Sequence, residues 1–211
     1  MADEDWFSHN IPVWSVFLES FKGKPKLRFL EIGSYEGRSA EWLCDNVLTG
    51  EGSELHCVDT FEGGQEHTAA QTQGLFDRFQ KRVFRHLECG RIAVIKGRSI
   101  EVLSALVASK CSGTYHFIYV DGSHTSRDVL GDAVLAWQLL APGGGIVFDD
   151  YTWDAYQEAD QNPRMAIDAF MACFTQECRV VLRTNQVWLQ KRGEPKATPW
   201  FRKPEEQQEA A

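Results

Sequence analysis

The pattern of apolar and polar residues along this chain predicts strands that alternate with helices. Five short apolar runs are rich in β-branched and aromatic residues, as buried parallel strands are. They lie at residues 27–32, 55–59, 92–95, 115–120 and 143–148. Because a strand, a helix and a parallel strand connect through a right-handed crossover, the alternation predicts a parallel sheet covered by helices.

Apolar residues at helical spacing occupy most of the segments between these runs. An amphipathic segment also precedes the first strand, with Pro12 in its first turn, and we expect residues 10–22 to form a capping helix. Pro163 introduces a short helix near the C-terminus. The predicted helices span residues 12–21, 38–47, 69–87, 100–108, 128–140 and 165–174.

Two apolar stretches near the end of the chain, residues 179–182 and 186–189, flank a polar turn and predict an antiparallel hairpin. The whole pattern predicts an α/β protein whose doubly wound, mostly parallel, seven-stranded sheet has this antiparallel C-terminal hairpin at its edge. We expect one domain over residues 1–191. Residues 192–211 contain prolines and charges without periodicity, so we expect a flexible tail.

Composition and charge narrow the choice of partners and compartment. The 211 residues carry a net charge of −8 and no dense Lys/Arg stripe, which argues against nucleic-acid binding. The six cysteines show no C-x-x-C spacing and are interpreted as reduced. The N-terminus is acidic where a signal peptide is basic, and no apolar run approaches the roughly 20 residues of a membrane span. We therefore expect a cytoplasmic protein with a small-molecule substrate and no membrane partner.

Acidic residues end the last two predicted parallel strands. Asp121 follows residues 115–120, His124 comes three positions later, and Asp149 and Asp150 follow the next strand. Since parallel strands place their carboxyl ends at one edge of the sheet, these side chains should share a crevice. Three carboxylates and an imidazole in one place indicate a divalent cation with a base beside it.

The loop after the first strand has the glycines expected of a cofactor loop. Gly33 and Gly37 open the way to a helix, where a ligand can approach the backbone and an anionic group can meet free N–H groups. Their spacing fits neither G-x-G-x-x-G nor G-x-x-x-x-G-K-[ST]. A ligand with a carboxylate, an amine and a ribose remains, and the acid that ends the second strand, Asp59, could hold the ribose. S-adenosylmethionine has these parts.

Several motifs together carry a family resemblance: Glu31-x-Gly33-x-x-x-Gly37-x-Ser39, Asp59, Gly97-x-Ser99, Asp121-Gly122-Ser123-His124, and Gly143 to Tyr151 with Asp149-Asp150. With them the chain resembles the class I S-adenosylmethionine-dependent methyltransferases over residues 10–191. This resemblance implies their Rossmann-like fold. The most similar branch is the metal-dependent O-methyltransferases, of the catechol type and of the bacterial type that methylates macrolide sugars. Many class I enzymes have a glycine where this chain has Tyr35.

The resemblance implies a set of cofactor-binding residues: Glu31, Gly33, Ser34, Gly37, Ser39, Asp59, Thr60, Arg98, Ser99 and Asp121. Gly33 and Ser39 would hold the methionine end, with Glu31 supporting its amine from beneath the loop. Asp59 would accept hydrogen bonds from the ribose hydroxyls, and the residues of the Gly97 loop would face the adenine. Plainer interpretations stay open, because the glycines could only permit a tight turn, Asp59 could be a turn acid and Ser99 could cap a helix.

The same resemblance implies Asp121, Asp149 and Asp150 as ligands of Mg²⁺ or a similar divalent cation. Asp121 and His124 would be the catalytic residues, with His124 as the general base, because an imidazole can accept a proton at cellular pH. A turn role for the acids, and a first-turn role for His124 without chemistry, stay open as well. Aromatic residues that could shape the acceptor pocket are Trp14, Phe61, Tyr151 and Trp153.

The sequence thus favours a Mg²⁺-dependent O-methyltransferase that transfers a methyl group from S-adenosylmethionine to a hydroxyl of a sugar or catechol-like molecule. One alternative is a metal-independent methyltransferase that uses His124 alone. Another is a non-catalytic module that only binds S-adenosylmethionine. Related enzymes often assemble, so a homo-oligomer is possible.

Overall fold

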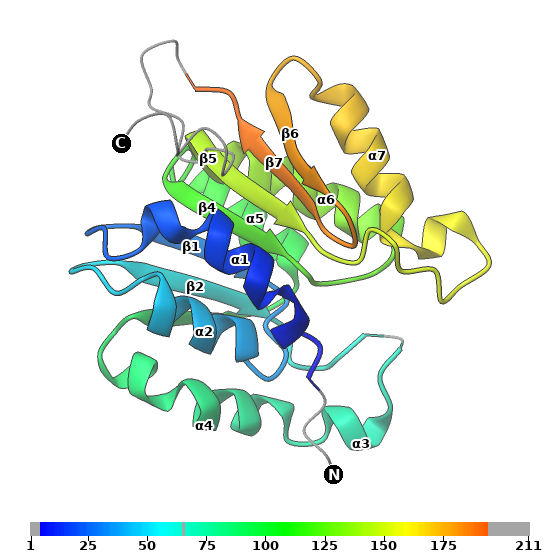
Figure 1. Ribbon diagram of the computed structural model, residues 1–211. Coiled ribbons are helices and arrows are strands. Elements are labelled where there is room, and N and C mark those ends of the chain that lie inside the picture. Colours follow the sequence, from blue (N-terminus) through cyan, green and yellow to red (C-terminus); the bar gives the residue numbers. More distant parts are fainter. Residues whose placement is uncertain (1–4, 65, 194–211) are drawn as a thin grey trace.

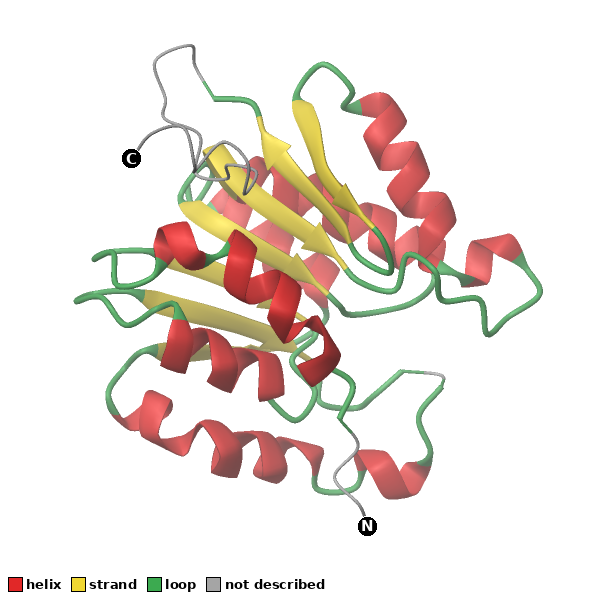
Figure 2. Ribbon diagram, in the orientation of Figure 1, coloured by secondary structure: helices red, strands yellow, loops and turns green. Residues whose placement is uncertain are grey.

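One mixed sheet with helices on both faces makes up the structure, a computed structural model that describes residues 5–64 and 66–193 (Figures 1 and 2). The strands are β1 (Arg28–Ile32), β2 (Glu54–Asp59), β3 (Ile92–Lys96), β4 (Tyr115–Val120), β5 (Leu140–Phe148), β6 (Cys178–Arg183) and β7 (Val187–Lys191). Their order is β3-β2-β1-β4-β5-β7-β6, and β1 to β5 pair in parallel. The predicted doubly wound, seven-stranded α/β fold is confirmed.

Helices cover each face of the sheet with its own hydrophobic core. The α-helices are α1 (Ile11–Phe17), α2 (Arg38–Asn46), α3 (Ala69–Thr72), α4 (Leu75–Glu88), α5 (Ser99–Ala108), α6 (Ser126–Leu139) and α7 (Pro163–Cys173). Buried residues of α1, α2 and α4 pack on one face, and those of α5, α6 and α7 pack on the other (Figure 1). This two-layer cover explains why β1 and β4 are apolar along almost their whole length.

Some predicted boundaries differ from the observed ones. The helix predicted for residues 69–87 is divided into α3 and α4 by Gly74, whose φ of +68° lies in the left-handed region. The predicted N-terminal helix is α1 with a 3₁₀ turn on each side, Ser8–Asn10 and Glu19–Phe21. Most of the predicted tail, from residue 194 on, lies outside the described residues.

The C-terminal hairpin is present, and its inner strand lies within the sheet. β7 pairs antiparallel with both β5 and β6, so β6 forms the edge. Burial explains the order, because Val187, Trp188 and Leu189 of β7 are fully covered whereas Val180 of β6 is 47% exposed. The more apolar strand takes the position that both neighbours protect.

Trp14 anchors α1 to the sheet. Its side chain is fully buried, and its ring meets Tyr119 at a centroid distance of 4.8 Å and Trp188 at 5.9 Å. Its indole N–H donates to Gln186 Oε1 at 3.0 Å. Trp14 is therefore a core residue, which excludes it from the wall of an acceptor pocket.

We predict that Trp14→Ala lowers the free energy of unfolding by about 3–5 kcal/mol, because it leaves a cavity and removes a buried hydrogen bond. Val16→Ala on the same helix should change it by less than about 0.5 kcal/mol, since Val16 is half exposed. Urea unfolding followed by circular dichroism measures both. Equal losses in the two variants would contradict this role of Trp14.

Candidate active site

A cleft of about 950 Å³ opens at the carboxyl ends of the parallel strands. The strand order reverses between β1 and β4, and ligands of open α/β sheets bind where it reverses. The volume is in the range of ordinary small-molecule sites. Seven predicted site residues line it: Gly33, Asp59, Thr60, Arg98, Ser99, Asp121 and His124.

The other predicted residues of the first loop form a buried hydrogen-bonded unit below the cleft. Glu31 is fully buried and accepts hydrogen bonds from the hydroxyls of Ser34, at 2.6 Å, and Ser39, at 2.5 Å. Burial raises the pKa of Glu31 from 4.5 to about 7, and the two serine hydrogen bonds limit the rise. Both hydroxyls are thus committed to Glu31, and the unit fixes the loop that follows β1.

Asp59 holds the loops on either side of it. Its Oδ2 accepts from the backbone N–H groups of Ser34 and Tyr35, at 2.7 and 2.8 Å, and its Oδ1 accepts from that of Phe61 at 2.6 Å. A carboxylate has about four acceptor positions, so lone pairs remain for hydroxyls in the cleft. Asp59 can therefore order the loops and also face a ligand.

The glycines of the first loop are required for packing within the protein. A Cβ on Gly33 would lie 1.9 Å from the carbonyl oxygen of Asp121, and one on Gly37 would lie 2.9 Å from the ring of Phe79. Contact with the residue that follows β4 and with α4 is therefore by itself a reason for glycine at these two positions. Tyr35 has a φ of +44°, a conformation in which glycine is usual, and its ring stacks on His67 at 4.9 Å.

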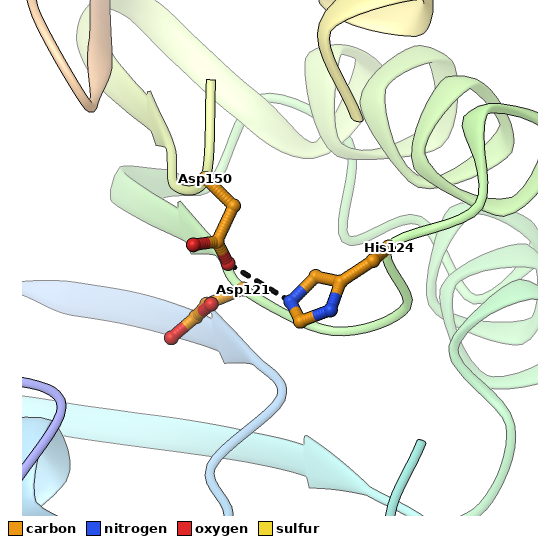
Figure 3. Close-up of side chains that lie close together, drawn as sticks. All are labelled: Asp121, His124 and Asp150. Atoms are coloured by element: carbon orange, nitrogen blue, oxygen red, sulfur yellow. Dashed lines mark ion pairs between the residues drawn. The ribbon is translucent and has the colours of Figure 1, made fainter. Parts of the chain in front are cut away.

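Asp121, His124 and Asp150 lie close together, as Figure 3 shows, and the first two line the cleft. One ligand atom from each lies within 4.8 Å of the other two, and His124 Nε2 is 2.9 Å from Asp150 Oδ2. His124 lies in the loop before α6, two residues ahead of the first residue of that helix. Asp150 has a φ of +57°, an uncommon backbone conformation that aspartate tolerates and that is frequent at functional sites.

Glu66 joins this group from the loop after β2. Its Oε1 is 3.5 Å from His124 Nδ1, so the imidazole lies between two carboxylates. Burial alone lowers the pKa of His124, but the neighbouring carboxylates of Asp150 and Glu66 outweigh it and raise the pKa to about 10. His124 is thus an imidazolium at neutral pH in this arrangement. No sequence pattern identified Glu66, because it stands alone in a polar loop.

Asp149 is connected to Asp121 through a buried tyrosine. The Tyr119 hydroxyl contacts Oδ2 of both acids, at 2.8 Å for Asp121. A hydroxyl has one hydrogen to donate, so it satisfies only one of the two oxygens at a time. Burial raises the pKa of Asp121 well above its usual range, and the charges of Asp149 and Asp150 raise it further. Such crowding of acids fits a site for a cation, and their oxygens are the ligands that Mg²⁺ prefers.

Gln186 fixes the orientation of Asp149 from the other side. Its Oε1 accepts from the indole N–H groups of Trp14 and Trp188, at 3.0 and 3.2 Å. Its amide nitrogen must therefore be the group that donates to Asp149 Oδ2, at 2.7 Å. Asp149 is not one of the three clustered residues, Asp121, His124 and Asp150. It is connected to them through the Tyr119 hydroxyl.

Of the four aromatic residues expected to shape the acceptor pocket, only Trp153 contacts the group of Asp121, His124 and Asp150. The ring of Trp153 lies 4.4 Å from that of His124. Phe61 packs in the core against Phe76 and Phe79, and Tyr151 is buried with its hydroxyl donating to Asp168 at 3.0 Å.

The family model for the methyltransferase domain matches residues 30–151, more than half of the 211-residue chain. The chain therefore belongs to the methyltransferase-domain family. It is an S-adenosylmethionine-dependent methyltransferase of class I and resembles the O-methyltransferases, as its motifs predicted. No curated protein matches the chain significantly.

Solved methyltransferase structures share the fold. The O-methyltransferase from Bacillus cereus, in complex with S-adenosylhomocysteine, aligns with a TM-score of 0.65 and 16% identity over 91% of this chain and 84% of that chain. TomG from Streptomyces achromogenes, an O-methyltransferase of tomaymycin synthesis solved with S-adenosylmethionine, gives 0.60 and 16% over 83% and 76%. MycE of the mycinamycin pathway, solved with Mg and S-adenosylhomocysteine, gives 0.58 and 16% over 93% and 53%. At these identities the likeness shows the fold alone.

No helix in the described part of the chain has both the length and the apolarity needed to cross a bilayer. All six cysteines are free, and three of them, Cys44, Cys57 and Cys178, are buried.

We predict that the stability of the protein depends on the ionisation of Glu31. Its pKa is higher in the folded chain, so its contribution is complete below about pH 4 and is lost as the pH rises through about 7, a change of about 3 kcal/mol. Glu31→Gln, which keeps the shape, should remove this part of the pH dependence. Urea unfolding at a series of pH values measures it.

Glu51→Gln, at an exposed position, controls for the loss of one carboxyl group. If Glu31→Gln and the wild type lost stability in parallel between pH 4 and 8, Glu31 would not be the buried acid described here.

Proposed function

We propose that the protein is a Mg²⁺-dependent O-methyltransferase that transfers a methyl group from S-adenosylmethionine to a hydroxyl of a small molecule, such as a sugar or a catechol-like ring. The observation that carries the proposal is the position of Asp121. It lines the cleft and also belongs to the group of acids at the ends of β4 and β5. A cofactor in the cleft and an acceptor at the acids would therefore be neighbours. MycE, which shares the fold, was solved with Mg and S-adenosylhomocysteine together, and this supports a divalent cation as a partner of the cofactor.

The donor set fits a hard divalent cation. Asp121 and Asp150 would hold the ion, and Asp149 would supply the third carboxylate from its position beside Tyr119. A bound Mg²⁺ lowers the pKa of a coordinated hydroxyl and orients it. With these three carboxylates as its ligands, the ion would keep room for an acceptor hydroxyl and water.

His124 would be the base that takes the hydroxyl proton. While Asp150 and Glu66 both hold it, its raised pKa keeps it protonated. It can accept a proton only where another cation shares the charge of Asp150. This arrangement favours the metal-assisted reaction over the alternative in which His124 acts without a metal.

The chain's own residues would place the cofactor. Asp59 has lone pairs for the ribose hydroxyls, and the backbone of the Gly33 loop would face the methionine end. Arg98 and Ser99, at the start of α5, would border the adenine. Methyl transfer then depends mainly on holding sulfur, methyl and acceptor oxygen in line.

We predict that EDTA abolishes methyl transfer to a catechol or sugar acceptor and that Mg²⁺ restores it. Asp150→Asn should lower kcat by about 100-fold or more, because even the outer partners of a metal site are worth 10- to 100-fold. Asparagine tolerates the positive φ of this position, so the fold should survive. Binding of S-adenosylhomocysteine, measured by calorimetry, should stay within about threefold of the wild type, because position 150 does not line the cofactor cleft.

Asp154→Asn in the same loop is the matched control and should leave both quantities unchanged. Full activity in excess EDTA would reject the metal and leave His124 as the sole base. Cofactor binding without transfer to any acceptor would favour a non-catalytic module.

A further inference from the structure

Asp132 is a buried acid that the proposed reaction does not use. Its side chain is 1% exposed, and neither carboxyl oxygen has a hydrogen-bond partner among the described residues. Burial raises the pKa of Asp132 to about 7, and the nearby Ser99 hydroxyl limits the rise. A buried polar group without a hydrogen-bond partner costs free energy. Asp132 therefore indicates a bound ligand that donates a hydrogen bond to it.

The position of Asp132 tells which partner could reach it. It lies in the middle of α6 and borders the same cleft as Arg98 and Ser99. A Cβ placed on Gly122 would be 3.7 Å from Asp132 Oδ2, so the acid lies close behind the backbone that follows β4. Ser99, which would border the adenine, lies near the same carboxyl group.

We propose that Asp132 recognises the adenine of the cofactor by accepting a hydrogen bond from its exocyclic amino group. This assignment rests on the proposed placement of S-adenosylmethionine in the cleft. A carboxylate can only accept, and the amino group is the only N–H donor of this base, because the ring nitrogens at its edges are acceptors. Asp132 is thus a specificity-determining residue that selects adenine against purines with an oxygen at this position.

The test compares S-adenosylhomocysteine with S-inosylhomocysteine, in which an oxygen replaces the amino group. Calorimetry at pH 8, without a metal, should show that the wild type prefers the adenosyl compound by about tenfold or more, the value of one charge-assisted hydrogen bond. Asp132→Ala should reduce the preference to less than about twofold by weakening the adenosyl compound. Asp132→Asn should reduce it by strengthening the inosyl compound, because the amide can donate to the new oxygen.

Asp128→Asn is the matched control on the same helix. Asp128 also borders the cleft, but its Oδ2 already accepts from the Ser123 hydroxyl at 3.0 Å, so the preference should remain that of the wild type. The melting temperature of unliganded Asp132→Asn should rise at pH 8, because the substitution removes a buried charge without a partner.

A purely structural role for Asp132 would give the opposite pair of results, a lower melting temperature in Asp132→Asn and an undiminished adenine preference in both variants. Either result would overturn the assignment. A wild type that fails to bind S-adenosylhomocysteine would reject the placement of the cofactor itself. Because no metal or acceptor is present in these titrations, they are independent of the proposed methyl transfer.

Discussion

Repulsion among acids at the ends of two neighbouring strands is the constraint around which this site is built. Val120 of β4 pairs with Phe148 of β5, so Asp121 and Asp149 necessarily follow side by side, and Asp150 comes next. Burial makes the repulsion stronger, because little water screens it. The Tyr119 hydroxyl and the Gln186 amide donate hydrogen bonds to these acids, and the His124 imidazolium pairs with Asp150. Only the imidazolium offsets negative charge, and a divalent cation would offset the remainder.

The same contacts connect the site to the core. The indoles of Trp14 and Trp188 donate to the oxygen of Gln186 and so turn its amide nitrogen toward Asp149. Through this amide, the N-terminal helix and the C-terminal hairpin, far apart in the sequence, hold one carboxylate of the site. The β1 loop is held in a comparable way, with Glu31 below it and Asp59 beside it. Rigid support of this kind is what positioning a methyl donor and an acceptor requires.

The sequence predicted what depends on local pattern. An apolar run followed by an acid locates β4 and Asp121, and the parallel arrangement brings Asp149 and Asp150 to the same edge. Residues identified only by tertiary contacts were missed. Tyr119 has the pattern of an ordinary buried strand residue, and Glu66 lies in a loop without periodicity. Asp132 occupies one polar position on a helix, and only the fold shows that this position is buried. The reason for glycine at position 33 was likewise visible only once Asp121 was placed against it.

A crystal structure of the protein with S-adenosylhomocysteine and Mn²⁺, a spectroscopically distinct substitute for Mg²⁺, would show whether these acids bind a divalent cation beside the cofactor. We expect one anomalous-scattering peak bounded by Asp121, Asp149 and Asp150, with the sulfur of the ligand on the cleft side of Asp121. His124 should then have moved out of hydrogen-bond distance of Asp150. Ligand density in the cleft with no peak at these acids, or a peak elsewhere in the molecule, would show that these acids are not a metal site.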